Sequence, residues 1–173
     1  RHLFTSPEFK AAAGQKLRRP FAFFAAAARA SGATVLEIDP ATEQLEKLGQ
    51  VPYKWLPPNG YPEVASPWTS TNGLLERWNT AMLMTEGAHG GAYTAMRTNL
   101  HQQISPVATV GELVSQVSQR VFGYALSGDE VQTYIDYASD GQGASTRLTP
   151  ALLSRKFGTL FGLMIASPTF QWC

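Results

Sequence analysis

The chain has 173 residues, about one domain, and its 44% hydrophobic residues are enough to bury a core. Fourteen Lys and Arg side chains against 13 Asp and Glu leave a net charge of +1, which argues against nucleic acid as a partner. The longest apolar run, around 160–166, is far shorter than the roughly 20 residues that cross a bilayer, so we expect no membrane span.

Prolines and the residues before them predict where helices begin. Six of the eleven prolines follow Ser, Thr or Asp, which cap helix N-termini, and proline suits the first helical turn because it has no N–H to leave unpaired. The six capping candidates are Ser6, Asp39, Ser66, Ser105, Thr149 and Ser167. In the related strings SPEF (6–9) and SPTF (167–170) we expect Phe9 and Phe170 to enter the core. Capping boxes at Thr109–Glu112 and Ser127–Glu130 predict two further helix starts.

Apolar spacing predicts the helices themselves. The first stripe is Leu17, Phe21, Phe24 and Ala28, with Gly32 as its end. A brief extended piece at 34–38 and a short amphipathic helix over Asp39–Leu48 follow. The next stripe is Leu75, Trp78 and Met82, and Gly87 is expected to end that helix.

Three more stripes complete the chain. They consist of Val114, Val117, Val121 and Tyr124, then Val131, Tyr134 or Ile135, and Ala138, and last Leu153, Phe157, Leu160, Phe161 and Met164. The last helix is the most apolar, so we expect it at the centre of the core. The sequence predicts an all-α fold, an irregular bundle of about six or seven helices, as one module over residues 1–173.

Residues 49–73 interrupt these helices with five prolines, four aromatic residues and three glycines. Two interpretations of the aromatic residues stay open. Their rings could form a platform for a glycan or a partner peptide, with exposed, coplanar Trp55 and Tyr61, or they could only anchor a long loop to the helices. Arg77, on the next helix, could bond free backbone groups of this loop. The candidate ligand-binding residues are Tyr53, Trp55, Tyr61, Trp68 and Arg77.

Carboxylates suggest an enzyme as the alternative. Glycoside hydrolysis uses two carboxyl groups about 5–9.5 Å apart, and the candidate catalytic residues are Glu63, Glu76 and Glu86. Glu86 and His89 have the i, i+3 spacing of di-iron ligands, but the glycines around them disfavour a helix and no second such pair occurs. The three histidines lack metal-ligand spacing, and the single Cys173 allows no cysteine site. We therefore predict no metal and no cofactor.

Four blocks in this order carry a family resemblance: TSPEF (5–9), KLRRPFAFFAAAARASGA (16–33), LGQVPYKWLPPNGYPEVASPWTSTNGLLERWN (48–79) and LTPALL with IASPTFQ (148–171). The chain resembles the C-terminal part of the bacterial family catalogued as domain of unknown function 1800. It departs from the family at Tyr61, where Trp is common, and at Ala22, where an acid is common. The resemblance implies a fragment of a longer, exported protein in the periplasm or outside the cell, and it implies no agreed activity.

These observations predict a helical binding module that contacts a glycan, a peptide or an N-terminal segment of the parent protein through residues 50–68. Two alternatives stay open. One is a hydrolase acting on polysaccharide through a carboxylate pair, and the other is a purely structural half-domain.

Overall fold

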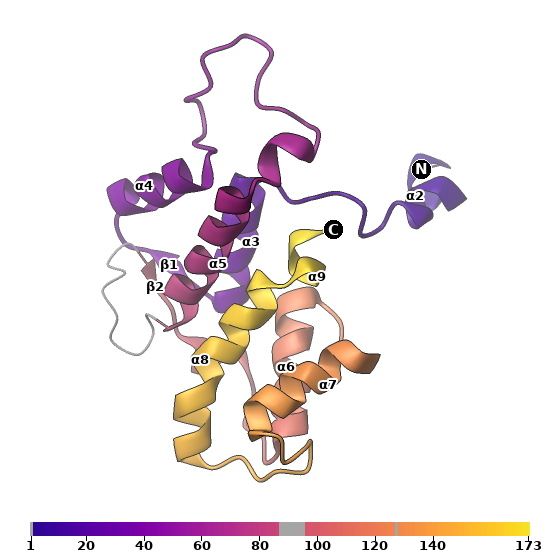
Figure 1. The fold of residues 1–173 in the computed structure, drawn as a ribbon, viewed down its shortest axis with the longest axis vertical. Helices are drawn as coiled ribbons and strands as arrows, with labels where there is room; N and C mark the ends of the chain where they lie inside the picture. Colours follow the sequence, from indigo (N-terminus) through magenta and orange to yellow (C-terminus); the bar gives the residue numbers. More distant parts are fainter. Residues whose placement is uncertain (1, 87–95, 127) are drawn as a thin grey trace.

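The computed structural model describes residues 2–86, 96–126 and 128–173, and within them the fold is helical, as predicted (Figure 1). Six helices of 11 to 17 residues form the body: α3 (Pro20–Ser31), α4 (Ile38–Leu48), α5 (Thr71–Glu86), α6 (Val110–Phe122), α7 (Gly128–Ser139) and α8 (Pro150–Ala166). The shorter elements are α1 (His2–Thr5), α2 (Pro7–Ala11), α9 (Pro168–Gln171), the 3₁₀ turns η1 (Ser66–Trp68) and η3 (Leu100–Gln103), and the antiparallel pair β1 (Thr34–Val35) and β2 (Met96–Arg97).

The capping predictions are confirmed where the cap is local. Ser6, Thr149 and Ser167 each accept a hydrogen bond from the backbone N–H three residues later, and Thr109 and Glu112 form the complete capping box. The predictions are wrong at the other three prolines. The helix around Asp39 begins one residue earlier, at Ile38, Ser66 is already inside η1, and Ser105 starts no helix. Ser127 lies outside the described residues.

Helices α5 and α8 pack against each other at the centre of the bundle, with α3 and α4 against α5, and α6 and α7 against α8. Their close approach depends on Gly162 of α8. A Cβ at this position would lie 2.6 Å from the Thr85 hydroxyl oxygen and 2.7 Å from the Met82 sulfur, both on α5. The prediction for the last helix is confirmed, since Phe157, Leu160, Phe161 and Met164 of α8 are fully buried.

The buried faces of α3 and α5 differ from the predicted stripes. Phe21 is exposed at the start of α3, whose buried face contains Phe23, Phe24, Ala27 and Ala30. Leu75 and Trp78 of α5 are exposed too, and its core side chains are Arg77, Thr80, Ala81, Met84 and Thr85. Tyr124 is exposed beyond Gly123, which ends α6 in the left-handed conformation. A stripe marks an apolar face, but the neighbouring helices decide whether that face is covered.

The phenylalanines of the two Ser-Pro-x-Phe strings differ in burial. Phe170 is buried, with its ring edge-on to Phe23 at 5.9 Å between centroids, so its predicted position is confirmed. Phe9 is exposed, and the prediction that it enters the core is wrong. Helices α1 and α2 stand away from the body in Figure 1, and the Phe9 ring contacts Phe4 of α1, with 5.3 Å between centroids. Leu17 lies before α3 and pairs with Trp172 near the end of the chain.

We expect Gly162→Ala to lower the free energy of unfolding by about 1–3 kcal/mol, although Ala favours helix by about 1 kcal/mol over Gly. The added methyl group meets Thr85, a stiff β-branched side chain that is fully buried. Urea unfolding measures this change. The matched control is Gly73→Ala in α5, where the nearest atom is the Ser70 hydroxyl at 3.1 Å. An equal effect of both substitutions would contradict the role of Gly162.

Candidate functional site

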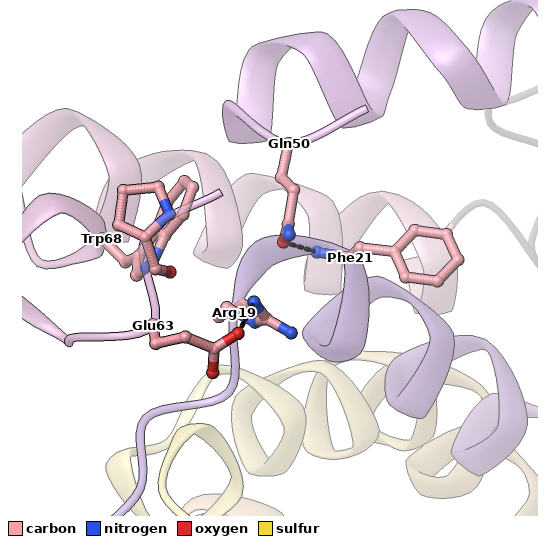
Figure 2. Close-up of polar contacts among 6 residues, drawn as sticks. Arg19, Phe21, Gln50, Glu63 and Trp68 are labelled. Carbon is pink, nitrogen blue, oxygen red and sulfur yellow. Dashed lines mark hydrogen bonds and ion pairs between the residues drawn. The ribbon is translucent and has the colours of Figure 1, made fainter. Parts of the chain in front are cut away.

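The aromatic loop, residues 50–68, follows α4, ends with η1 and projects from one end of the bundle (Figure 1). Its base is bonded to the start of α3. The Gln50 side-chain oxygen accepts a hydrogen bond of 3.0 Å from the Phe21 N–H, one of the first-turn donors that have no partner within the helix (Figure 2). Gln50 is buried, so this contact fixes the point where the loop begins.

Two predicted aromatic residues hold the loop backbone together. The Tyr61 hydroxyl donates to the Val51 carbonyl at 2.8 Å and accepts from the Val51 N–H at 3.2 Å. These two bonds join the second half of the loop to its first residues. Trp68 is buried, and its indole N–H donates to the Pro62 carbonyl at 3.1 Å. Tyr61 and Trp68 therefore hold the loop together from within, through bonds to its own backbone.

Trp55, Tyr61 and Trp68 form a file of rings from the surface to the interior. Trp55 lies 4.7 Å from Tyr61 at an interplanar angle of 42°, and Tyr61 lies 6.0 Å from Trp68 at 47°. The rings of Trp55 and Tyr61 are tilted, not coplanar. Trp55 is 37% exposed, and its indole N–H donates to the Asn59 side-chain oxygen. These three rings therefore pack against one another at tilted angles and do not form a flat outer platform.

The charged residues of the loop are paired with the body. Lys54 contacts Glu46 of α4 at 2.5 Å, and Glu63 contacts Arg19 at 2.7 Å (Figure 2). Tyr53 and Leu56 are almost fully exposed, and the paired side chains of Lys54 and Glu63 also remain more than half exposed. Tyr53 also has φ of +65°, an uncommon left-handed conformation for a residue with a bulky side chain. The loop surface therefore combines exposed apolar side chains with charges that are paired to the body.

Arg77 is the largest fully buried side chain among the described residues, at 1% exposure. One terminal nitrogen donates to the Arg18 carbonyl at 2.8 Å, and the guanidinium lies 5.3 Å from the centre of the Phe23 ring. Its other terminal nitrogen has no hydrogen-bond partner within residues 2–86, 96–126 and 128–173. Burial lowers the pKa of Arg77 from its ordinary value to about 10. The side chain joins α5 to the start of α3, and its predicted ligand-binding role stays a prediction.

The predicted catalytic residues lie on the aromatic loop and on α5. Glu63 is paired with Arg19, Glu76 is half-buried on α5, and Glu86 is the last residue of α5. His89 lies outside the described residues, and the His101 ring packs on Phe157 at 5.0 Å. The part of the chain that the structure describes contains no group of three or more His, Cys, Asp or Glu side chains placed to hold a metal ion.

Sequence reasoning missed an apolar groove of about 580 Å³ between α5, α7 and α8. We call it the α5/α7/α8 groove, and its apolar walls are Leu75, Trp78, Met82, Tyr134, Tyr137 and Leu163. Burial raises the pKa of the Tyr134 phenol, as expected in surroundings of low polarity. The stripe Leu75, Trp78 and Met82 was visible in the sequence, but nothing in the sequence showed that this face remains open.

Comparison with known proteins identifies a family but no activity. The model of a family described as "Protein of unknown function (DUF1800)" matches residues 1–172. No curated protein and no solved structure matches the chain. None of the helices in the described ranges is long and apolar enough to cross a membrane.

We expect Tyr61→Phe to loosen the aromatic loop while the helical body stays folded. The substitution keeps the ring but removes the hydroxyl, which leaves the Val51 N–H without its partner, at a cost of about 1–3 kcal/mol for such a group when it is buried. The Val51 carbonyl loses one of its two donors and keeps the Lys54 N–H. Proteolysis within 50–68 should become several-fold faster. Tyr53→Phe is the matched control, because the Tyr53 side chain is fully exposed. Unchanged proteolysis of Tyr61→Phe would show that its hydroxyl does not hold the loop.

Arg77→Ala should lower the free energy of unfolding by about 2–4 kcal/mol, because it leaves a cavity and an unpaired Arg18 carbonyl. Arg77→Met should lower the free energy of unfolding by less than Arg77→Ala does. Methionine keeps most of the side-chain volume of arginine and buries no charge. Urea unfolding at neutral pH compares the two variants, and equal losses would contradict a cost for the buried charge.

The same residue predicts a pH effect. The folded-state pKa of about 10 lies below the ordinary value of the unfolded chain, so in the pH window between these two pKa values the unfolded chain binds more protons than the folded chain. The free energy of unfolding of the wild type should therefore rise with pH in this window relative to Arg77→Met. The difference between the two proteins, measured at pH 9 and pH 11, cancels the titration of all other groups. A difference that does not change with pH would contradict the lowered pKa.

Proposed function

We propose that this chain, which belongs to the DUF1800 family of proteins of unknown function, is a helical binding module that holds an apolar, uncharged segment of a partner protein on its aromatic loop. One observation carries the proposal. Tyr53 and Leu56 are almost fully exposed on a loop whose own base and ring file are bonded in place.

The loop is ordered before a partner binds. Gln50, Tyr61 and Trp68 satisfy backbone groups of the loop or of α3, and the ion pairs of Lys54 and Glu63 tie both sides of the loop to the body. A preorganised loop loses little conformational entropy when it binds, so more of the contact energy contributes to affinity. Burial of a Leu or comparable apolar side chain supplies about 1.5–3 kcal/mol.

The side chains of the aromatic loop favour a polypeptide over a glycan as the ligand. A sugar ring stacks on a flat aromatic face and needs free hydrogen-bonding groups at its edge, whereas Trp55 and Tyr61 are tilted at 42°. The Asn59 side-chain oxygen already accepts from Trp55, and Lys54 and Glu63 are paired. An apolar segment needs only the exposed surface of Tyr53 and Leu56. The carboxylates offer no comparable support for a hydrolase, because Glu63 is paired with a cation rather than placed beside a second acid.

A random peptide display library, selected on the wild-type chain, tests this proposal. We expect apolar peptides whose affinity, measured by isothermal titration calorimetry, falls at least tenfold for the variant Tyr53→Ser/Leu56→Ser, a loss of about 1.4 kcal/mol or more. Leu36→Ser/Ile38→Ser is the matched control, because these apolar side chains are also exposed but lie outside the loop. It should leave affinity unchanged.

Three outcomes would contradict the proposal. The selected peptides could bind equally well to the Tyr53→Ser/Leu56→Ser variant. A glycan panel could instead yield the ligand, with the tryptophan fluorescence of the chain changing on addition of the oligosaccharide. Product release from a polysaccharide would favour the hydrolase.

A further inference from the structure

We propose that residues 2–14 of one copy of this chain, which we call the arm, bind in the α5/α7/α8 groove of a second copy, so that two chains associate by exchanging arms. This interaction uses neither Tyr53 nor Leu56 and is independent of the function proposed for the aromatic loop.

The arm presents an apolar knob that residues 2–86, 96–126 and 128–173 of its own chain leave exposed. Neither α1 nor α2 has a buried residue, and Leu3, Phe4 and Phe9 are 69%, 66% and 49% exposed. The rings of Phe4 and Phe9 contact each other edge to face, with 5.3 Å between centroids and an interplanar angle of 90°. Such a pair is a favourable aromatic geometry, so the knob is formed before it meets a partner. The Ser6 cap holds α2 in place beneath it.

The base of the arm is fixed to the body. Lys16 and Cys173 exchange two backbone hydrogen bonds of 3.1 and 2.9 Å, and the Arg18 N–H donates to the Gln171 carbonyl at 2.8 Å. Gly14, with φ of +75°, then turns the chain away from this pairing, and the arm stands off the bundle in Figure 1. This anchoring directs the knob away from the bundle of its own chain.

The groove has the chemistry and the size for this knob. Its walls are apolar and aromatic, and the Trp78 indole is held by a hydrogen bond of 3.0 Å to the Ala166 carbonyl while its ring stays half-exposed. A cavity of about 150 Å³ holds one benzene ring. Two phenyl rings and a leucine side chain therefore need roughly three times this volume, which fits within the 580 Å³ of the groove.

The buried area fits a dimer at the small end of specific interfaces. An aromatic side chain offers roughly 150–250 Å², so the exposed parts of the three knob residues and the groove surface that they cover amount to about 500 Å² for each arm. Two reciprocal arms then bury about 1,000 Å², the lower limit expected of a biological interface. Reciprocal exchange also fills both grooves and closes the assembly at two copies.

Sedimentation velocity over a range of protein concentrations tests the association. We expect the wild-type chain to dimerise, and Phe4→Ser/Phe9→Ser in the arm and Leu75→Glu in the groove each to raise the dimer dissociation constant at least tenfold. Leu83→Glu is the matched control, since Leu83 is an exposed side chain of the same helix that does not line the groove. Circular dichroism checks that every variant keeps its helical content. A wild-type chain that stays monomeric at all concentrations, or a dimer that both test variants leave intact, would overturn the proposal.

Disulfide trapping then identifies which groove the arm occupies. In a Cys173→Ser background, which removes the only native thiol, chains carrying Phe9→Cys are mixed with chains carrying Leu75→Cys and oxidised. We expect a disulfide-linked heterodimer by mass spectrometry, and the pairing of Phe9→Cys with Leu83→Cys as the control should give little. If one chain carrying both Phe9→Cys and Leu75→Cys forms mainly an internal disulfide at low concentration, the arm occupies its own groove and exchange is overturned.

Discussion

The close packing of α5 against α8 at Gly162 is the constraint on which the rest of the structure depends. Without a side chain at Gly162, Met82 and Thr85 of α5 approach the α8 backbone, and this contact sets the rotation of α5 about its axis. The rotation directs Arg77 and Thr80 toward α3 and α4, where Arg77 bonds to Arg18 and Thr80 accepts from Gln44 at 2.7 Å. It leaves Leu75 and Trp78 on the open side, as walls of the α5/α7/α8 groove.

Polar contacts inside the fold leave apolar surface outside it, and both proposed interaction surfaces arise in this way. In the aromatic loop Gln50 and Tyr61 are bonded to backbone groups and Glu63 is paired with Arg19 at the surface, while Tyr53 and Leu56 face solvent without such contacts to the body. In the groove the Trp78 N–H is bonded to α8, which leaves the ring face free. An apolar surface with its polar groups already paired loses little on desolvation, so it suits contact with another polypeptide.

The candidate site was only partly predictable from sequence. The proline and aromatic content of 49–73 correctly identified an irregular loop with ring anchors, because stiff, bulky residues in a long loop need buried contacts to be ordered. Whether Trp55 and Tyr61 formed a flat platform or a tilted wedge depended on the hydrogen bonds of Tyr61 to Val51, which lies ten residues away in the chain. The burial of Arg77 could not be predicted from sequence either, because it depends on Phe23 of α3 and on Arg18 just before α3.

The sequence by itself determined where many helices begin and end. The caps at Ser6, Thr109, Thr149 and Ser167, and the left-handed glycine after α3, are contacts within a few residues, so local chemistry decides them. Only the tertiary structure decided which apolar residues are covered. Phe9 and Phe170 follow the same Ser-Pro cap, yet Phe9 is exposed beside Phe4 of the short α1, while Phe170 is buried against Phe23 of α3 and Phe122 of α6. The difference arises because a side chain is buried only where helices of the body surround it.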